Sequence, residues 1–358
     1  MPPVTIVLYG ATCYTGRLVA DELARRGLDR VLSGRDPEKL ARFGDAPTKA
    51  VSLDDDAALR DLLEGAAVVI NCAGPFTVAG DALVRAAIAT GTHYVDSTGE
   101  QSFIQMVFER HGGAAERAGV ALLPALGFDY APGDCISRLA AGGIEPLDEL
   151  VLAYAVEGFG LSRGTLRSAL EMMKGGDVVY EDERWRPAPG GVFKASFDFP
   201  EPIGRQAMSR YPSGEVITVP HHTRTRKVTS LLTTRTAAPF AAAAPLLPYT
   251  LPALGLALRT PLRRALNTAV GLLPEGPRED ARRAAEFTIV AIARGAGGAT
   301  RQGVVRGSDV YGLSAVTLTH AAELLSAPGF DRAGALGPAA AFDPAAFLNH
   351  LELAWQLD

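Results

Sequence analysis

Cysteine is scarce in this chain, and its three cysteines form neither a CxxC pair nor a cluster with histidine. They stand alone at Cys13, Cys72 and Cys135. Disulfide frameworks and structural zinc sites depend on such pairs and clusters. The sequence therefore predicts no disulfide framework and no metal site. A loop role is predicted for His221-His222, since no third ligand lies close by in the sequence.

Positive charge is also limited. The formal net charge is −5, and no basic block interleaves with aromatic residues, so we expect no nucleic-acid partner. The chain does not open with a charged segment followed by an apolar one, and we expect a cytoplasmic protein. With 358 residues, 47% hydrophobic and 21% charged, the composition predicts a globular protein of two domains.

Charged residues are absent from the 22-residue stretch Ala237–Leu258. That length suits a membrane span, but interior prolines break a helix at a cost of about 3 kcal/mol or more each. We therefore predict no transmembrane span. We expect an apolar flap that packs at a homodimer contact or beside an apolar portion of the substrate, with peripheral membrane contact left open. The interrupting prolines are Pro239, Pro245, Pro248 and Pro252.

The first 35 residues present a strand–turn–helix–strand pattern. Val4–Tyr9 reads as a strand, residues 17–26 as a helix and Val31-Leu32 as a second strand. The glycine-rich turn between strand and helix would set a pyrophosphate against the N–H groups of a helix N-terminus. A plain turn without a ligand is the alternative, because Cys13 stands where the usual middle glycine would be. The predicted phosphate-binding residues are Gly10, Thr12, Cys13, Tyr14, Thr15 and Gly16.

The end of the second strand predicts which dinucleotide binds. NAD sites usually place an acidic residue there for the ribose 2′-OH, whereas NADP sites supply an arginine for the 2′-phosphate. This strand ends in Ser33-Gly34-Arg35, and Asp36 comes one residue too late. We predict NADP(H), bound by Ser33 and Arg35 with Lys39 close by.

Strands and helices alternate about five times over residues 1–130. The apolar run Ala66–Ile70 ends in residues 71–76, where Gly74-Pro75 would pass closely over the dinucleotide or would form an ordinary turn. The pattern predicts an α/β fold whose N-terminal domain is a Rossmann doubly wound parallel sheet. Four more predicted cofactor-binding residues follow that apolar run: Cys72, Ala73, Gly74 and Pro75.

Residues 131–305 have a different pattern, with mixed strands and long connections. It predicts a second, α+β domain for substrate binding and dimerisation. The expected strands are Leu150–Val156, Phe193–Phe199, Val216–Val219, Val228–Arg235, Glu286–Ala293 and Gln302–Val305.

Five blocks occur in the order found in saccharopine dehydrogenase-like oxidoreductases: GATCYTG, SGR, NCAGPF, GTHYVDSTGE and GFDYAPGD. Three later blocks resemble the trans-acting enoyl reductase branch of that family, namely SRGT from Ser162, LPEGP with Arg278 and Arg282, and DVYG with Glu323. The resemblance spans nearly the whole chain and implies an NADP-dependent reductase. It also implies that the C-terminal helices of residues 306–358 pack back on the Rossmann domain. Three positions depart from the family pattern: Cys13, Arg163 and Val310.

A reductase also needs a proton, from a side chain or from water. Tyr130 and Asp96 follow expected strand ends and are the predicted catalytic residues, with His93 as a further candidate. Each has a structural alternative, and solvent serves equally well as the donor. Arg163 and Arg167 could bind a substrate carboxylate or could be solvated surface residues.

The sequence as a whole predicts an NADPH-dependent reductase of an activated double bond in a small molecule. An enoyl C=C in an acyl or polyketide-like substrate is favoured by the enoyl-reductase-like blocks. An imine reductase or saccharopine-type amino acid dehydrogenase is the first alternative. A non-catalytic dinucleotide-binding scaffold or lipid-associated protein is the second.

Overall fold

A computed structural model describes residues 5–128, 130–173, 176–191, 193–237, 260 and 262–358. The chain forms two compact units. The first unit contains residues 1–131 and 311–341, and the second contains residues 132–310 and 342–358. The expected C-terminal segment 306–358 is therefore divided between the units. Its last 17 residues differ from the expectation because they supply a strand to the sheet of the second unit.

The first unit is built on a parallel sheet of seven strands, ordered β15-β6-β5-β4-β1-β2-β3. The chain moves outward from β1 in one direction and later in the other, so the carboxyl ends of β1 and β4 are neighbours at a switch point. This confirms the predicted doubly wound sheet. The strands are β1 Ile6–Tyr9, β2 Arg30–Gly34, β3 Thr48–Ala50, β4 Val68–Asn71, β5 His93–Asp96, β6 Ala121–Leu123 and β15 Gly334–Ala335.

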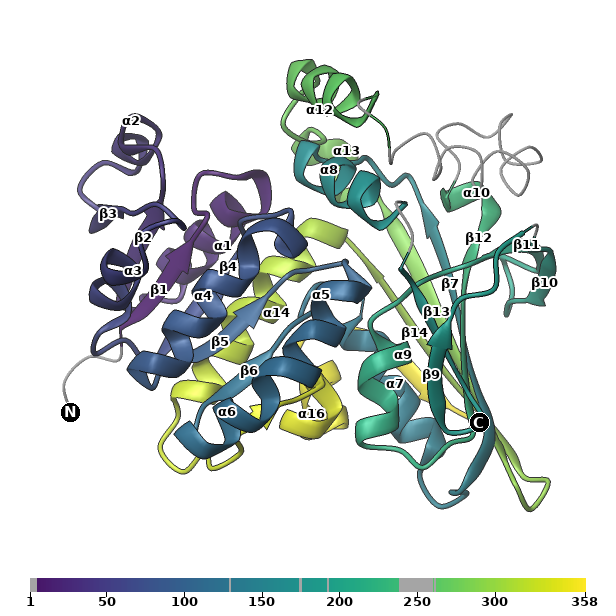
Figure 1. Cartoon of the computed structure of the whole chain (residues 1–358). Helices are drawn as coiled ribbons and strands as arrows, with labels where there is room; N and C mark the ends of the chain where they lie inside the picture. Colours follow the sequence, from purple (N-terminus) through teal and green to yellow (C-terminus); the bar gives the residue numbers. More distant parts are fainter. Residues whose placement is uncertain (1–4, 129, 174–175, 192, 238–259, 261) are drawn as a thin grey trace. The chain divides into compact units, whose positions relative to one another are not determined.

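Helices cover both faces of this sheet (Figure 1). Alternate residues of β1, Val7 and Tyr9, point into one core layer, which leucines and valines of α3 and α4 complete. On the other face α1 and α14 pack together, and Arg26 of the first pairs with Glu323 of the second. The helices are α1 Tyr14–Arg25, α2 Pro37–Leu40, α3 Asp56–Leu63, α4 Phe76–Thr90, α5 Gln101–Met106, α6 Gly112–Ala118, α14 Val310–Ser326 and α15 Pro338–Ala341.

The second unit is built on a mixed sheet ordered β10-β11-β12-β7-β13-β14-β16, with β8 and β9 attached beside β12. The long strands β7 and β13 pair antiparallel along their whole length, while β7 and β12 run parallel. The strands are β7 Leu147–Glu157, β8 Val178–Glu181, β9 Arg184–Pro187, β10 Ala195–Asp198, β11 Arg205–Arg210, β12 Lys227–Thr233, β13 Glu286–Gly295, β14 Thr300–Ser308 and β16 Ala354–Leu357.

One predicted strand of this unit is wrong. Residues 216–219 belong to a short helix, α9, and the following 3-10 turn. β-branched side chains favour a strand there, but all four residues of α9 are buried, and tertiary packing overrides that weak preference. The described helices of the second unit are α7 Ala131–Ala141, α8 Arg163–Met172, α9 Glu215–Thr218, α10 Thr234–Ala237, α12 Leu262–Leu272, α13 Glu279–Arg283 and α16 Pro344–His350.

The uncharged stretch lies almost wholly outside the described residues, which end at Ala237 and resume at Thr260. Its packing role and the homodimer expected from it stay predictions. Among the helices of the described ranges, none is both long and apolar enough to cross a membrane.

Candidate dinucleotide-binding site

The turn after β1 is shaped by two glycines that no larger residue could replace. Gly10 has φ +81°, and a Cβ there would lie 2.7 Å from the backbone nitrogen of Ala73. A Cβ on Gly16 would lie 2.9 Å from the carbonyl carbon of Gly10 and closer still to its oxygen. The strand-to-helix turn and the segment after β4 therefore meet backbone to backbone, as a close dinucleotide cradle requires.

Cys13 stands where the middle glycine would be, and its thiol makes two hydrogen bonds. Its φ of −76° is ordinary for any residue, so the position does not need glycine. Sγ accepts the Gly16 N–H at 3.2 Å and donates to the Cys72 carbonyl oxygen at 3.1 Å. The thiol thus caps α1 and ties the turn to the segment that follows β4.

Helix α1 begins directly after this cap. Its first two residues, Tyr14 and Thr15, direct their N–H groups towards the helix N-terminus, where the dipole favours an anion. The Tyr14 ring packs edge to face on Tyr311, with ring centroids 5.0 Å apart. Arg17 donates to the Thr12 carbonyl oxygen at 2.9 Å and so holds the turn from its outer side.

The end of β2 supplies one exposed arginine. The Ser33 hydroxyl is buried and donates to the Lys49 carbonyl oxygen at 2.7 Å, so it ties β2 to β3. Lys39 pairs with Asp36. In the described part of the chain Arg35 takes part in no ion pair, and it lies close enough to Tyr9 to act on its pKa. Burial raises the pKa of that tyrosine to about 12, and the Arg35 guanidinium opposes the rise.

The segment after β4 carries the other four predicted residues, Cys72 to Pro75. The Ala73 N–H donates to the side-chain oxygen of Asn71 at 2.9 Å, which fixes the segment where it faces Gly10. Burial raises the pKa of the Cys72 thiol well above its usual range, so this cysteine stays protonated. Gly74-Pro75 is a cis peptide immediately before α4.

Asp96 lies at the centre of a buried network that joins three strand ends. Its carboxylate accepts the N–H groups of Thr98 and Ala125 at 2.9 Å and the hydroxyl of Tyr94 at 2.7 Å. The Tyr94 oxygen in turn accepts from Asn71 at 3.0 Å. Burial raises the pKa of Asp96 to about 7, although these hydrogen bonds lower it. Asp96 thus joins the carboxyl ends of β4 and β5 to the segment that follows β6.

Tyr130 and His93 are likewise engaged within the first unit. The Tyr130 side chain is buried, and its hydroxyl donates to the Gly99 carbonyl oxygen at 2.8 Å. His93 accepts the Ala121 N–H at 3.0 Å and packs on the ring of Phe330. Burial lowers the pKa of His93, which favours the neutral ring.

Glu100 is a buried carboxylate that the sequence analysis did not single out. Its fully buried carboxylate accepts the Phe76 and Thr77 N–H groups, each at 2.8 Å, and the Thr77 hydroxyl at 2.6 Å. It therefore occupies the N-terminus of α4, where the helix dipole stabilises a negative charge. Its place in the GTHYVDSTGE block was the available signal.

In the second unit, hydrogen bonds and ion pairs join the blocks that resemble enoyl reductases. The Arg163 N–H donates to the Glu275 carbonyl oxygen at 3.0 Å, and the two side chains form an ion pair. Arg163 also donates to the Gly271 carbonyl oxygen, and Arg282 pairs with Asp309 at 2.7 Å. Both arginines thus act inside the framework of this unit.

The first unit has the features expected of an NADP-binding domain. Its strand-to-helix turn packs backbone to backbone against the segment after β4, its second strand ends without an acidic residue, and Arg35 after that strand is exposed. Residues 6–123 match the family model described as the saccharopine dehydrogenase NADP binding domain. The predicted cofactor class is confirmed, because that model describes an NADP-binding domain.

The named relatives match only part of this chain. The chain is 35% identical over 185 residues to a protein of Mycobacterium tuberculosis named as a trans-acting enoyl reductase, covering 47% of this chain and 44% of the relative. It is 28% identical over 195 residues to a saccharopine dehydrogenase-like oxidoreductase of Bos taurus, covering 47% and 46%. The matched part is thus less than half of each relative's length.

A solved structure of low sequence identity matches along nearly the whole chain. The apo saccharopine dehydrogenase (L-Glu forming) of Saccharomyces cerevisiae superposes with a TM-score of 0.61 at 13% identity, covering 99% of this chain and 100% of the other. At that identity the likeness shows the fold alone. Together the comparisons confirm the predicted resemblance and the predicted fold class.

Proposed function

We propose that this protein is an NADPH-dependent reductase that delivers a hydride to an activated double bond, an enoyl C=C in an acyl or polyketide-like substrate. The observation that carries the cofactor half is Arg35, exposed and without an ion pair among the described residues, beside the glycine cradle. The enoyl half is supported by the three blocks of the second unit and by the relative named as an enoyl reductase.

When bound, NADPH supplies the hydride, and the protein supplies binding and orientation. The N–H groups of Tyr14 and Thr15 would face the pyrophosphate, and Arg35 would pair with the 2′-phosphate. The Asn71–Tyr94–Asp96 network holds the strand ends that carry the segment from Cys72 to Pro75. Tyr130 and Asp96 remain our candidates for proton delivery, and either would first have to exchange an internal hydrogen bond. Solvent is the competing donor.

Replacing Arg35 tests the cofactor assignment. Arg35→Ala should weaken NADPH binding by roughly 10- to 100-fold and leave NADH binding nearly unchanged, because only NADPH carries the phosphate that the guanidinium would bind. Calorimetric titration of both dinucleotides measures this. Arg42→Ala, an exposed arginine in the same region, is the control. Equal losses for both dinucleotides would remove Arg35 from the 2′-phosphate site.

A substrate panel tests the reaction itself. NADPH consumption is followed with enoyl thioesters of increasing chain length and with cyclic imines. Turnover of the thioesters supports the proposal, whereas turnover of imines alone would replace it with imine reduction. NADPH binding without any turnover would favour the dinucleotide-binding scaffold.

A further inference from the structure

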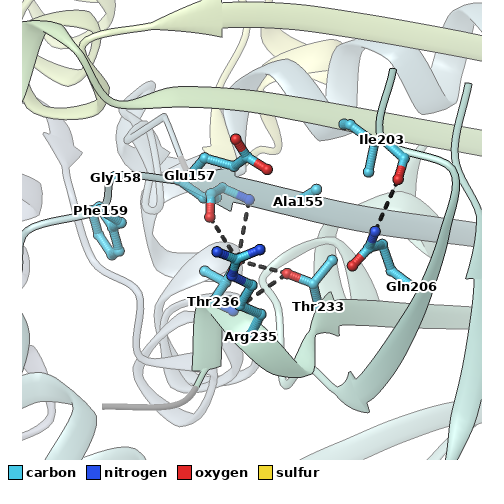
Figure 2. Close-up of a pocket in the computed structure, with 10 residues that line it drawn as sticks. Ala155, Glu157, Gly158, Phe159, Ile203, Gln206, Thr233, Arg235 and Thr236 are labelled. Carbon is cyan, nitrogen blue, oxygen red and sulfur yellow. Dashed lines mark hydrogen bonds between the residues drawn. The ribbon is translucent and has the colours of Figure 1, made fainter. Parts of the chain in front are cut away.

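The second unit holds a pocket that the proposed function does not use. It is a cavity of about 330 Å³ at the carboxyl ends of the parallel strands β7 and β12, closed on one side by the start of β11 (Figure 2). Its volume falls at the lower end of the range of small-molecule sites. The lining residues are Ala155, Val156, Glu157, Gly158, Phe159, Ile203, Gln206, Thr233, Arg235 and Thr236.

Two opposite charges line this pocket without pairing with each other. Arg235 and Glu157 are both exposed, and among the described residues neither takes part in an ion pair. Across the sheet Glu157 is in register with Glu286, a second carboxylate, so its strand neighbour cannot neutralise it. A guanidinium and a carboxylate that have no ion-pair partner among the described residues, in one cavity, suit a ligand that satisfies both.

The neutral polar groups of the pocket are mostly committed. The Thr236 hydroxyl donates to the Val156 carbonyl oxygen at 2.8 Å and lies 2.6 Å from the Thr233 hydroxyl. The Gln206 amide N–H donates to the Ile203 carbonyl oxygen at 2.9 Å, which turns its own carbonyl oxygen towards other donors. The pocket therefore offers one strong donor fork, on Arg235, and two acceptors, on Glu157 and Gln206.

Apolar surface completes the site. Ala155, Phe159 and Ile203 contribute side chains to the walls, so an aliphatic body can be buried between the polar ends. Guanidinium binds carboxylate in a planar, two-bonded geometry, and a carboxylate acceptor requires a hydroxyl or N–H on the ligand.

We propose that this pocket binds a small organic acid whose carboxylate pairs with Arg235 and which carries a hydrogen-bond donor directed at Glu157. The donor is a hydroxyl or an ammonium group, and both present the same hydrogen-bond chemistry to the pocket. The site is formed by the second unit alone and does not depend on the reductase activity proposed above.

Calorimetry on the full chain, without dinucleotide, tests the site with three matched probes. Isovalerate has no donor, α-hydroxyisovalerate carries a hydroxyl and valine carries an ammonium group. We expect saturable binding of one or both donor-bearing acids, at least about 10-fold tighter than isovalerate. The preferred probe identifies the donor.

Two variants assign the contacts. Arg235→Ala should weaken the preferred acid by roughly 10-fold or more, while Arg235→Lys keeps part of the affinity. Glu157→Gln should remove most of the advantage of the donor-bearing acid over isovalerate. Arg184→Ala, an exposed arginine outside the pocket, is the control, and circular dichroism checks that each variant folds.

The pattern across variants decides the outcome. Equal losses in Arg184→Ala and Arg235→Ala would show a general charge effect and overturn the proposal. So would saturable binding of inorganic phosphate with none of the three acids, or an unchanged donor preference in Glu157→Gln.

Discussion

The two units bury acidic side chains in different ways. In the first unit, Asp96 and Glu100 receive backbone N–H groups from loop and helix starts at the carboxyl edge of the sheet. In the second unit, Asp134 receives the Thr218 hydroxyl at 2.5 Å and the His222 ring at 2.9 Å, and Glu215 bonds the Tyr154 hydroxyl.

The difference separates two structural tasks. Acids bonded to backbone groups fix the course of the main chain, and the main chain is what a dinucleotide meets in a cradle of this kind. The acids of the second unit, bonded to side chains, instead tie α9 to α7 and to β7. We therefore expect backbone-directed contacts to control cofactor binding and side-chain pairs to control pH-dependent stability.

The backbone contacts of the first unit are tested most severely at Gly16. Gly16→Ala should abolish measurable NADPH binding and destabilise the first unit by about 3 kcal/mol or more, because its Cβ would overlap the Gly10 carbonyl group, which cannot move independently of the turn. NADPH titration and amide hydrogen exchange of α1 measure the two effects.

Gly113→Ala provides the matched control. Gly113 lies inside α6 with only the end of the Arg117 side chain near its Cβ position, so alanine there should be neutral or stabilising by up to about 1 kcal/mol. If Gly16→Ala behaved like this control, the close contact of the turn would not matter for binding.

We expect the next largest effect from replacing Glu100. Glu100→Gln should destabilise the first unit by about 2–3 kcal/mol, because the amide NH2 must face donors at the start of α4. Hydrogen exchange of α4 peptides measures the loss. Asp55→Asn is the control, since this exposed cap of α3 accepts one N–H and asparagine caps equally well. Equal effects of both variants would contradict a special role for the buried carboxylate.

These contacts show how far the sequence predicts the site. Local patterns are sufficient for the βαβ unit, because alternation, glycine spacing and the SGR end all lie within 35 residues. They do not reveal that Glu100 caps α4, since its partners are 23 and 24 positions away in the sequence. They likewise do not reveal the committed hydroxyl of Ser33, which depends on pairing with β3.

The second unit was harder to predict for a related reason. Its sheet pairs strands distant in sequence, such as β14 with β16, and these strands are short or polar. The pocket arises where β7, β11 and β12 meet, and no sequence pattern brings Glu157 and Arg235 together.

Glu215 tests the side-chain half of the comparison. Burial raises its pKa to about 8, so the folded chain holds a proton between pH 4.5 and 8 that the unfolded chain releases. The contribution of Glu215 therefore lowers stability as pH rises through that window. Glu215→Gln cannot ionise and should gain stability relative to wild type across it, by on the order of 2 kcal/mol.

Urea unfolding followed by tryptophan fluorescence reads this effect selectively, because both tryptophans, Trp185 and Trp355, lie in the second unit. Asp177→Asn is a useful comparison, since burial raises the pKa of that carboxyl only to about 6 and its window should end earlier. A Glu215→Gln variant whose pH dependence matched wild type would show that Glu215 is not the group responsible.

Cys13 gives the smallest effect and the finest test of backbone-directed bonding. Its thiol bonds two backbone groups, the Gly16 N–H and the Cys72 carbonyl, and its own backbone needs no glycine. The family-like change Cys13→Gly therefore removes both bonds and adds chain entropy in the unfolded state. It should cost the first unit about 1 kcal/mol while NADPH affinity changes by less than about threefold. Cys13→Ser retains a donor and an acceptor at the same place and should remain near wild type. Hydrogen exchange of α1, together with NADPH titration, compares the two variants.

If serine and glycine were equally destabilising, the bonds would be irrelevant and the size of sulfur would explain the residue. If glycine instead reduced NADPH affinity as severely as Gly16→Ala, the thiol would contribute to the cofactor site directly.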